Sequence, residues 1–291
     1  MIYDVSHKTV YRYSAPVVQS QHIVHMSPRH VDHQEVRGHT LLIDPAPTLR
    51  EEREDYYGNR VVMFDIEQEH KELVVHAKST IEVTPPQEID LERSTRWDVL
   101  AGLVAKPKAG IDLEVVGYAC ASKHTRPRAE IADYARRSFA PGRAILPAAW
   151  DLVSRIYDDF VFDTTATDVS TPVVQVLRQR RGVCQDFSHL ALACLRAMHL
   201  PARYVSGYIL TSPPPGLPRL AGADASHAWI SVWAPEAGWT DFDPTNGLMP
   251  RDEHIAIAYG RDYDDVSPIS GILLGGSEHS VDVGVDVLPV G

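Results

Sequence analysis

Hydrophobic and polar residues alternate with a period of two along the first third of the chain. Every second residue from Tyr3 to Tyr11 shares one face, which is typical of a half-buried β-strand. Several short strands and almost no helical periodicity predict a β-sandwich-like domain over residues 1–85, with a boundary at Thr84-Pro85-Pro86. The further strands are predicted at 20–26, 40–44, 61–66, 73–78 and 79–83.

The pattern changes to helical spacing in the middle of the chain. Residues 128–138 and 147–159 repeat their hydrophobic positions as a helix does. Ser170-Thr171-Pro172 predicts another helix start, because a hydroxyl N-cap and a proline in the first turn both favour one. A further helix is expected from Cys184 to His199, where Pro201 stops it.

Strand periodicity returns after the last of these helices, while residues 212–222 are rich in Pro and Gly and predict a loop. Helices followed by mostly antiparallel strands indicate an α+β fold. We expect a linking segment with helices over 86–145 and a core over 146–291 that includes the C-terminal strands. The strands in this part are predicted at 204–210, 227–233, 239–242 and 281–287.

Composition and charge narrow the possible partners. Of the 291 residues, 44% are hydrophobic and 23% are charged, which is typical of a globular protein. The net charge of −11 argues against a nucleic-acid partner, since phosphate binding needs clustered Lys and Arg. That charge gives only a weak bias toward neutral or basic substrates.

The expected location is the cytoplasm, without a membrane partner. No run approaches the ~18 apolar residues that a membrane helix needs, and the chain opens without the basic and apolar regions of a signal peptide. Three cysteines are an odd and sparse set, which fits free thiols in a reducing compartment. The sequence does not indicate an oligomeric state.

Three residues could act together in nucleophilic catalysis. Cys184 begins a predicted helix, His227 begins a predicted strand, and Asp243 lies in the turn that closes the next strand. A helix N-terminus stabilises a thiolate and offers N–H groups to an oxyanion. A histidine could take the thiol proton and return it to a leaving amine, and a carboxylate could orient that histidine.

Each of these residues also has an ordinary structural explanation when it is taken alone. A cysteine near a helix start is usually a small buried hydrophobic residue. His227 could equally be a core histidine, and an Asp-Pro-Thr turn is common. Cys194, in the middle of its helix, is expected in the core, and Cys120 is expected in a loop.

No metal and no cofactor are predicted. Cys184 and His189 are five residues apart and face different sides of a helix, whereas zinc needs three or four converging ligands. The aspartates at 262, 264 and 265 lack the glycine and the terminal Glu of a calcium-binding loop. There is no phosphate-binding glycine loop and no dinucleotide-binding fingerprint.

The segments around the three residues resemble the bacterial transglutaminase-like family, whose members are often labelled cysteine proteases. The resemblance covers nearly the whole chain and is weakest over residues 85–145. The N-terminal segments 11–13 and 26–29 resemble the β-domain that precedes the core in this family. The core segments that carry the resemblance are Thr171-Pro172, Arg181 to Leu190, Leu200 to Tyr208, Ser226 to Trp229, Asp241 to Asn246 and the stretch from His254 to Pro268.

The resemblance implies a papain-like α+β core that uses Cys184 as nucleophile, His227 as base and acid, and Asp243 as orienting group. Asp241 is the alternative for the last role, because strand alternation puts both aspartates on one face. Phe162 stands where a tyrosine is common in the family, so the Cys184 backbone N–H is the expected oxyanion donor. Supporting positions around the site, with plain packing as the alternative, are Gln185, Asp186 and Trp229.

The implied activity is thiol-dependent acyl transfer on a peptide or protein amide through an acyl-enzyme. Hydrolysis, as in a peptidase or amidase, is favoured. Aminolysis would make the protein a protein-glutamine transglutaminase, because the nucleophile that resolves the acyl-enzyme is set by pocket shape and water exclusion. A non-catalytic peptide-binding or assembly module on the same fold is the other alternative.

Overall fold

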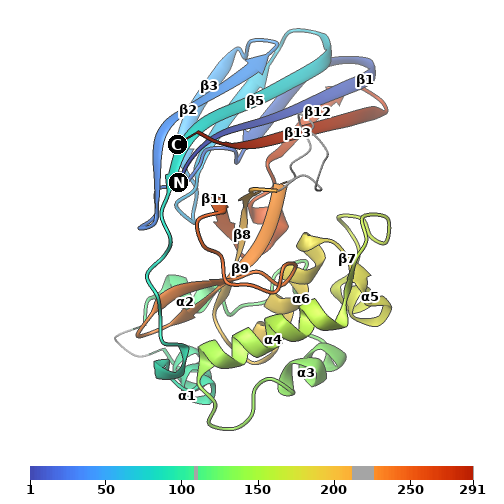
Figure 1. Cartoon of the computed structure of the whole chain (residues 1–291). Coiled ribbons are helices and arrows are strands. Elements are labelled where there is room, and N and C mark those ends of the chain that lie inside the picture. The colour runs from blue at the N-terminus through green and yellow to red at the C-terminus, as the bar shows by residue number, and fades with distance from the viewer. Residues whose placement is uncertain (108–110, 212–225, 291) are drawn as a thin grey trace, which may run out of the picture.

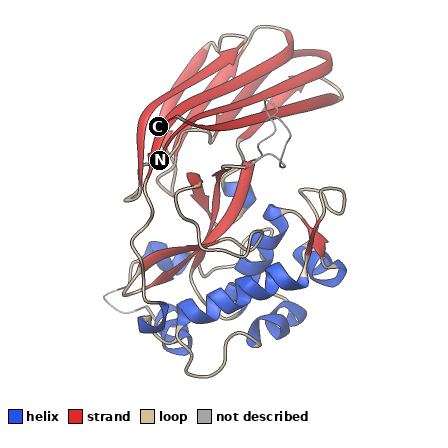
Figure 2. Cartoon of the chain, viewed as in Figure 1, coloured by secondary structure: helices blue, strands red, loops and turns tan. Residues whose placement is uncertain are grey.

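The computed structural model describes residues 1–107, 111–211 and 226–290. The upper part of the molecule is a domain of β-strands, and the lower part combines helices with a second sheet (Figure 1). Figure 2 shows that the long helices lie in the lower part only. The expected α+β fold with an N-terminal β-domain is confirmed. The loop predicted at 212–222 lies outside the described residues.

The upper domain is one curled antiparallel sheet, in which β1 takes part from end to end. The first half of β1 lies between β5 and β13, and its second half lies between β4 and β12. Next to β5 lies β2, and next to β4 lies β3. The strands are β1 (Ile2–Val24), β2 (Gln34–Asp44), β3 (Leu49–Glu54), β4 (Arg60–Ile66), β5 (His70–Val83), β12 (Ile269–Gly275) and β13 (His279–Pro289).

The runs predicted at 3–11 and 20–26 are the two halves of the single strand β1. The pairing of β1 with β5 shifts its register between Arg12 and Val17. Pro16 lies in this interval, where its missing N–H removes no bond from that pairing. β3 was not predicted from the sequence, because all six of its residues are exposed and show no alternation.

The two C-terminal strands lie in the N-terminal sheet. β12 pairs Ile269 with Val24, and β13 pairs Val283 with Thr9. The strand predicted at 281–287 is therefore present, but the expectation that it belongs with the core differs from the structure. Alternation of hydrophobic and polar residues identifies the two faces of a strand, but it does not determine which strand lies next to it. The segment boundaries expected at residues 85 and 145 stay predictions.

The lower domain is an antiparallel sheet of order β10-β9-β8-β11 with α6 packed against it. Almost all of α6 is buried, and hydrophobic residues of α3, α4 and α5 belong to the same core. The elements are α1 (Trp97–Ala105), α2 (Leu113–Gly117), α3 (Ala129–Arg136), α4 (Ile145–Asp159), β6 (Val161–Phe162), α5 (Val173–Gln179), β7 (Arg181–Gly182), α6 (Cys184–Ala197), β8 (Ala202–Ile209), β9 (Ser226–Ala234), β10 (Gly238–Phe242), β11 (His254–Gly260) and the short 3-10 helices η1 (Leu91–Arg93) and η2 (Tyr263–Asp265).

One helix start differs from the expectation. α5 begins at Val173, with Pro172 at the N-cap and no side-chain cap. The hydroxyls of Ser170 and Thr171 bond to Asp168 instead, so they shape the preceding turn. Among the described residues, every helix is too short or too polar to cross a membrane.

β11 is buried on both faces, which explains why its sequence does not alternate. Ile255 and Ile257 belong to the core beneath the sheet, whereas Ala256 and Tyr259 pack with Val31 of the upper domain. A buried run of this length cannot be assigned by periodicity alone. The strand was therefore not predicted from the sequence.

Two amides of the upper domain hold β11 as a neighbouring strand would. Gln34 Nε2 donates to the Ala256 carbonyl, and the Ala256 N–H donates to Gln34 Oε1, both at 2.8 Å. Asn59 exchanges the same pair of bonds with Tyr259, at 2.7 and 2.8 Å. Each amide thus satisfies one buried backbone donor and one acceptor. The upper domain is fixed to the core along this strand.

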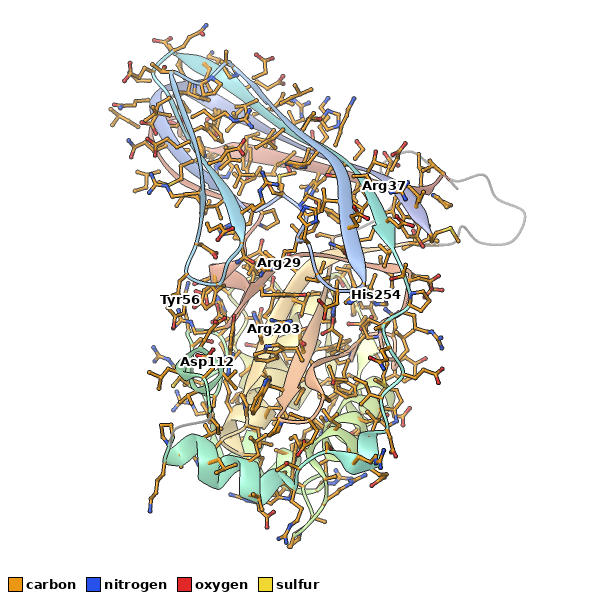
Figure 3. The ribbon with its side chains drawn as sticks, turned by 90° about the vertical axis from the view of Figure 1, so that its left-hand side faces the viewer. Arg29, Arg37, Tyr56, Asp112, Arg203 and His254 are labelled. Atoms are coloured by element: carbon orange, nitrogen blue, oxygen red, sulfur yellow. The ribbon has the colours of Figure 1, made fainter. Side chains whose placement is uncertain are left out.

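Two guanidinium groups add to this junction. Arg29 lies 4.4 Å from the centre of the Tyr259 ring and Arg203 lies 3.5 Å from it, in cation–π contact. Figure 3 places Arg29, Arg203 and His254 at the level where the two domains meet.

We expect Asn59→Ala to lower the free energy of unfolding by about 2–4 kcal/mol, because it leaves the buried N–H and C=O of Tyr259 unpaired. Urea denaturation measures the change. Gln68→Ala, an exposed amide in the same domain, serves as the control and should stay within about 0.5 kcal/mol of wild type. Equal stability of the two variants would contradict the role given to Asn59.

Candidate active site

Cys184 is the first residue of α6 and is partly exposed. The carboxylate of Asp186 bends back to the start of this helix, where its Oδ2 accepts the Val183 N–H at 2.8 Å. The same oxygen accepts the hydroxyl of Thr167 at 2.6 Å. Burial raises the pKa of Asp186, and these two bonds act in the opposite direction. Asp186 therefore fixes the backbone that carries Cys184.

Gly182 makes room for this carboxylate. A Cβ at position 182 would lie 2.6 Å from Asp186 Oδ2 and 2.9 Å from Asp186 Cβ. No side chain fits at these distances. The order Gly182-Val183-Cys184 with Asp186 two residues later is thus a requirement of the helix start.

His227 lies near the beginning of β9 and faces the turn that follows β10. Its Nε2 donates to Oδ2 of Asp243 at 2.7 Å. The other oxygen of Asp243 accepts the N–H groups of Thr245 and Asn246 at 2.8 and 3.2 Å, which forms an Asx turn. The local turn and the pairing of β9 with β10 together bring the imidazole and the carboxylate into contact.

The imidazole also interacts with the nucleophile candidate. Cys184 acts to raise the pKa of His227, and because Nε2 is held by Asp243, Nδ1 is the nitrogen left for the thiol. Burial acts to lower the pKa of His227, but the interactions with Asp243 and Cys184 outweigh it and raise the pKa to about 10. His227 is therefore the protonated partner of both groups at neutral pH.

A second histidine reaches the same carboxylate. His254, the first residue of β11, has its Nε2 3.1 Å from Asp243 Oδ2. Burial acts to raise the pKa of Asp243, but the hydrogen bonds from His227 and His254 hold it well below its usual range. Sequence reasoning gave His254 no role, since no local signal shows that β11 pairs with β8 beside the site.

Trp229 and Asp241 form a separate pair beside the imidazoles. The indole N–H of Trp229 donates to Asp241 Oδ2 at 2.9 Å. The Trp229 ring centre lies 6.0 Å from that of His227 and 5.1 Å from that of His254. The structure thus brings Asp243, and not Asp241, into hydrogen-bonding contact with His227, while Asp241 holds the indole.

The remaining candidates lie outside this group. Gln185 Nε2 donates to the Val169 carbonyl at 3.3 Å. Phe162 pairs with Gly182 in the β6–β7 ladder and has an exposed side chain. Cys194 is buried and Cys120 is exposed. His189 accepts the Tyr263 N–H with its Nε2 at 3.1 Å, so that nitrogen is engaged.

His227, Asp243 and His254 also offer three potential metal-ligand atoms within 4.8 Å of one another. Both histidines use Nε2 for the hydrogen bonds to Asp243. A metal ion would have to replace both of these protons, because a histidine binds metal through a deprotonated nitrogen. The observed arrangement is that of two histidines oriented by one carboxylate.

Two family models match the chain. The bacterial transglutaminase-like N-terminal region matches residues 3–82, and the transglutaminase-like superfamily matches residues 133–244. The second match contains Cys184, His227 and Asp243. The resemblance seen in the sequence is therefore confirmed.

Similar proteins cover either the whole chain or the core. An uncharacterized protein of Mycobacterium tuberculosis is 41% identical over 99% of this chain and 92% of its own length. A protein-glutamine gamma-glutamyltransferase of Pseudomonas aeruginosa is 31% identical over 44% of this chain and 20% of its own length. The crystal structure of a "Putative Cysteine Protease from Cytophaga hutchinsonii" covers 100% of this chain and 92% of that one, with a TM-score of 0.75 at 20% identity. This last similarity shows the fold.

Gly182→Ala should lower the free energy of unfolding by about 2–3 kcal/mol, because the added methyl group displaces the Asp186 cap. Gly102→Ala is the matched control in α1, where an added Cβ meets nothing within 4 Å. Helix propensity should leave that variant unchanged or stabilise it by up to about 1 kcal/mol. Chemical denaturation of both variants measures the difference. Similar stabilities would contradict the close approach at Gly182.

Asp243→Asn should lower the pKa of His227, because burial then acts without the compensating carboxylate. Titration of the imidazole by NMR measures the shift, and Asp241→Asn should leave the titration near its wild-type position. The folded pKa of about 10 lies above the usual histidine pKa of 6.5. The stability that His227 contributes is therefore fully present below pH 6.5 and is lost as pH rises toward 10. An unchanged titration in Asp243→Asn would refute this assignment.

Proposed function

Because the chain belongs to the transglutaminase-like superfamily, we propose that it transfers acyl groups from peptide or protein amides through Cys184, His227 and Asp243. The observation that supports this proposal is the placement of His227. Its imidazole bonds to a buried carboxylate, and its pKa is raised by that carboxylate and by a thiol at a helix N-terminus. This is the order of groups that nucleophilic thiol catalysis requires.

The proposed reaction begins from a Cys184 thiolate beside a protonated His227. The Cys184 sulfur attacks the amide carbonyl carbon, and the carbonyl oxygen takes up negative charge. The backbone N–H groups at the start of α6 have no intrahelical acceptor and can stabilise that oxyanion. His227 then donates its proton to the amide nitrogen. The C–N bond breaks, the amine leaves, and a thioester on Cys184 remains.

The second half of the reaction regenerates the starting state. His227 takes a proton from water, the resulting hydroxide attacks the thioester, and the sulfur leaves as the thiolate while His227 keeps the proton. The products are a carboxylic acid and the free enzyme. Asp243 keeps the imidazole oriented throughout, and His254 helps to keep Asp243 ionised.

Hydrolysis is the favoured outcome, and transamidation is the second candidate. The relative named protein-glutamine gamma-glutamyltransferase aligns with part of this chain, and this supports an amine as the competing nucleophile. A non-catalytic peptide-binding module is disfavoured, because Cys184, His227 and Asp243 are all present and in contact. The cytoplasmic location and the absence of nucleic-acid and membrane partners stay predictions.

Alkylation by iodoacetamide across pH tests the thiol directly. Cys184 should react rapidly near pH ~6, where an unpaired thiol with a pKa of ~8.5 is slow. His227→Ala should abolish this reactivity at pH ~6. The exposed Cys120 is an internal control in the same sample, and peptide mass spectrometry separates the two sites. If the alkylation rate of Cys184 followed the same pH dependence as that of Cys120, the proposal would be refuted.

The product distinguishes the two outcomes of the same reaction. Turnover of a peptide amide in the presence of a primary amine gives the acid if water resolves the thioester, and the new amide if the amine does. Mass spectrometry identifies the product. Cys184→Ala should form neither.

A further inference from the structure

A cavity of about 700 Å³ is lined by residues around the start of α3, by residues around the start of α5 and by Asp264. One wall includes Val169, whose carbonyl accepts the hydrogen bond from Gln185, the residue after Cys184. Another wall includes His124, whose ring stacks on His189 of α6 with 5.0 Å between the ring centres. The walls of the cavity therefore contact α6 at Gln185, the residue after Cys184, and at His189. Its size suits part of a peptide.

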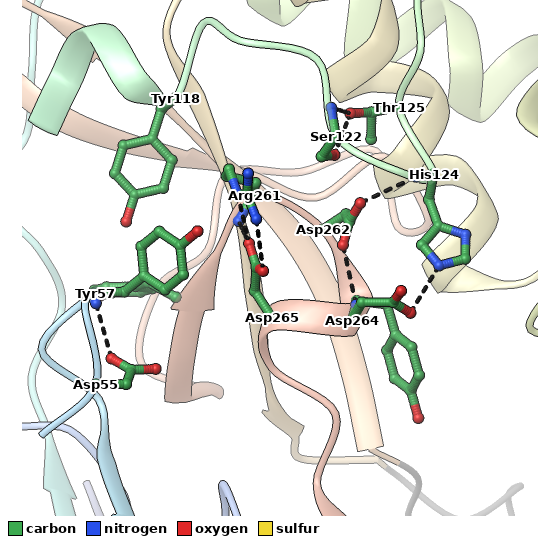
Figure 4. A network of polar contacts seen from close by, with 12 residues as sticks. Asp55, Tyr57, Tyr118, Ser122, His124, Thr125, Arg261, Asp262, Asp264 and Asp265 are labelled. Carbon is green, nitrogen blue, oxygen red and sulfur yellow. Dashed lines mark hydrogen bonds and ion pairs between the residues drawn. The ribbon is translucent and has the colours of Figure 1, made fainter. Parts of the chain in front are cut away.

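The lining of the cavity is positively charged in a chain whose net charge is −11. Two acidic residues are already paired there. Asp264 bonds to Lys123 at 2.6 Å and to His124 at 2.8 Å (Figure 4 shows the bond to His124). Glu130 is held by a fork of two hydrogen bonds from Arg178.

Two arginines of the lining remain without an acidic partner. Arg126 and Arg128 are exposed and form no ion pair with any residue that the structure describes. Arg128 is also the N-cap of α3 and supplies no side-chain cap, so the first N–H groups of that helix add positive potential at the same wall. Guanidinium groups bind carboxylates through paired N–H donors.

The wall beside Val169 is apolar. Pro172, Val173 and Val174 line it together with Val169. An occupant therefore meets an apolar surface near Gln185 and positive charge at Arg126 and Arg128. A peptide with a carboxylate close to its reacting amide combines these properties.

We propose that this cavity binds a carboxylate of the peptide substrate at Arg126 and Arg128 while the reacting amide lies at Cys184. The position of the amide rests on the proposed acyl transfer, whereas binding of the carboxylate does not. The carboxylate comes either from an Asp or Glu side chain or from the C-terminus of the peptide. The positive charge of the cavity thus favours acidic substrates. The net charge of the whole chain, in contrast, suggests a weak preference for neutral or basic ones.

Calorimetric titration of three unlabelled pentapeptides tests the proposal, with the full chain carrying Cys184→Ala so that no turnover occurs. The probes are Ala-Ala-Glu-Ala-Ala amide, the matching Gln peptide amide, and the Gln peptide with a free C-terminus. At least one carboxylate peptide should bind about tenfold more tightly than the neutral one. Its advantage should shrink as salt is raised from about 0.05 to 0.5 M. The peptide that gains affinity identifies the source of the carboxylate.

Arg126→Gln with Arg128→Gln should remove this preference. Arg136→Gln with Arg137→Gln is the matched control, because these exposed arginines follow on the same helix but do not line the cavity. Thermal unfolding verifies that both double variants are folded. Equal binding of all three peptides, or a preference that survives in the cavity variant, would overturn the proposal.

Iodoacetamide alkylation of the wild-type chain, compared with the peptide titrations, separates this proposal from the proposed function. A reactive Cys184 without a carboxylate preference would refute the cavity and leave the acyl transfer. A carboxylate preference with an unreactive Cys184 would refute the acyl transfer and leave the binding site.

Discussion

The Asp243 carboxylate has no exposed surface, and an isolated charge in that position would be costly. Five hydrogen bonds reach it from the turn after β10, from the start of β9 and from the start of β11. These donors come from three different segments, and the carboxylate orients each of them. Asp243 therefore holds the three segments together. The interaction of His227 with Cys184 extends this group to the start of α6.

The upper domain supports this arrangement from a distance. His254 begins β11, and the backbone of β11 is held by Gln34 and Asn59 on the side away from the helices. Neither amide contacts the His254 imidazole. A substitution of Gln34 or Asn59 would therefore affect that imidazole only through the backbone of β11. Both domains therefore support the candidate site, although Cys184, His227 and Asp243 all belong to the lower one.

Local signals in the sequence were sufficient to mark the candidate residues, and the family resemblance implied their roles. A helix start, a strand start and an Asp-Pro-Thr turn are each encoded within a few residues, and they mark Cys184, His227 and Asp243. His254 was not predicted as part of the site, because β11 is buried on both faces and its sequence lacks the alternation that indicates a strand. The cavity was not predicted from the sequence either. Its lining comes from three separate stretches, around residues 126, 172 and 264, which only the tertiary fold brings together.

The pairing of β1 with β13 makes the upper domain discontinuous in the chain. Tyr3 lies opposite Pro289, and the marked ends lie close together in Figure 1. The helical core is thus an insertion between β5 and β12, and β1 can pair with β13 only after the whole core between them has been synthesised. A permuted chain that joins these neighbouring ends and opens elsewhere would keep every contact of the site. Removal of the final strand would instead expose one edge of β1 along much of its length.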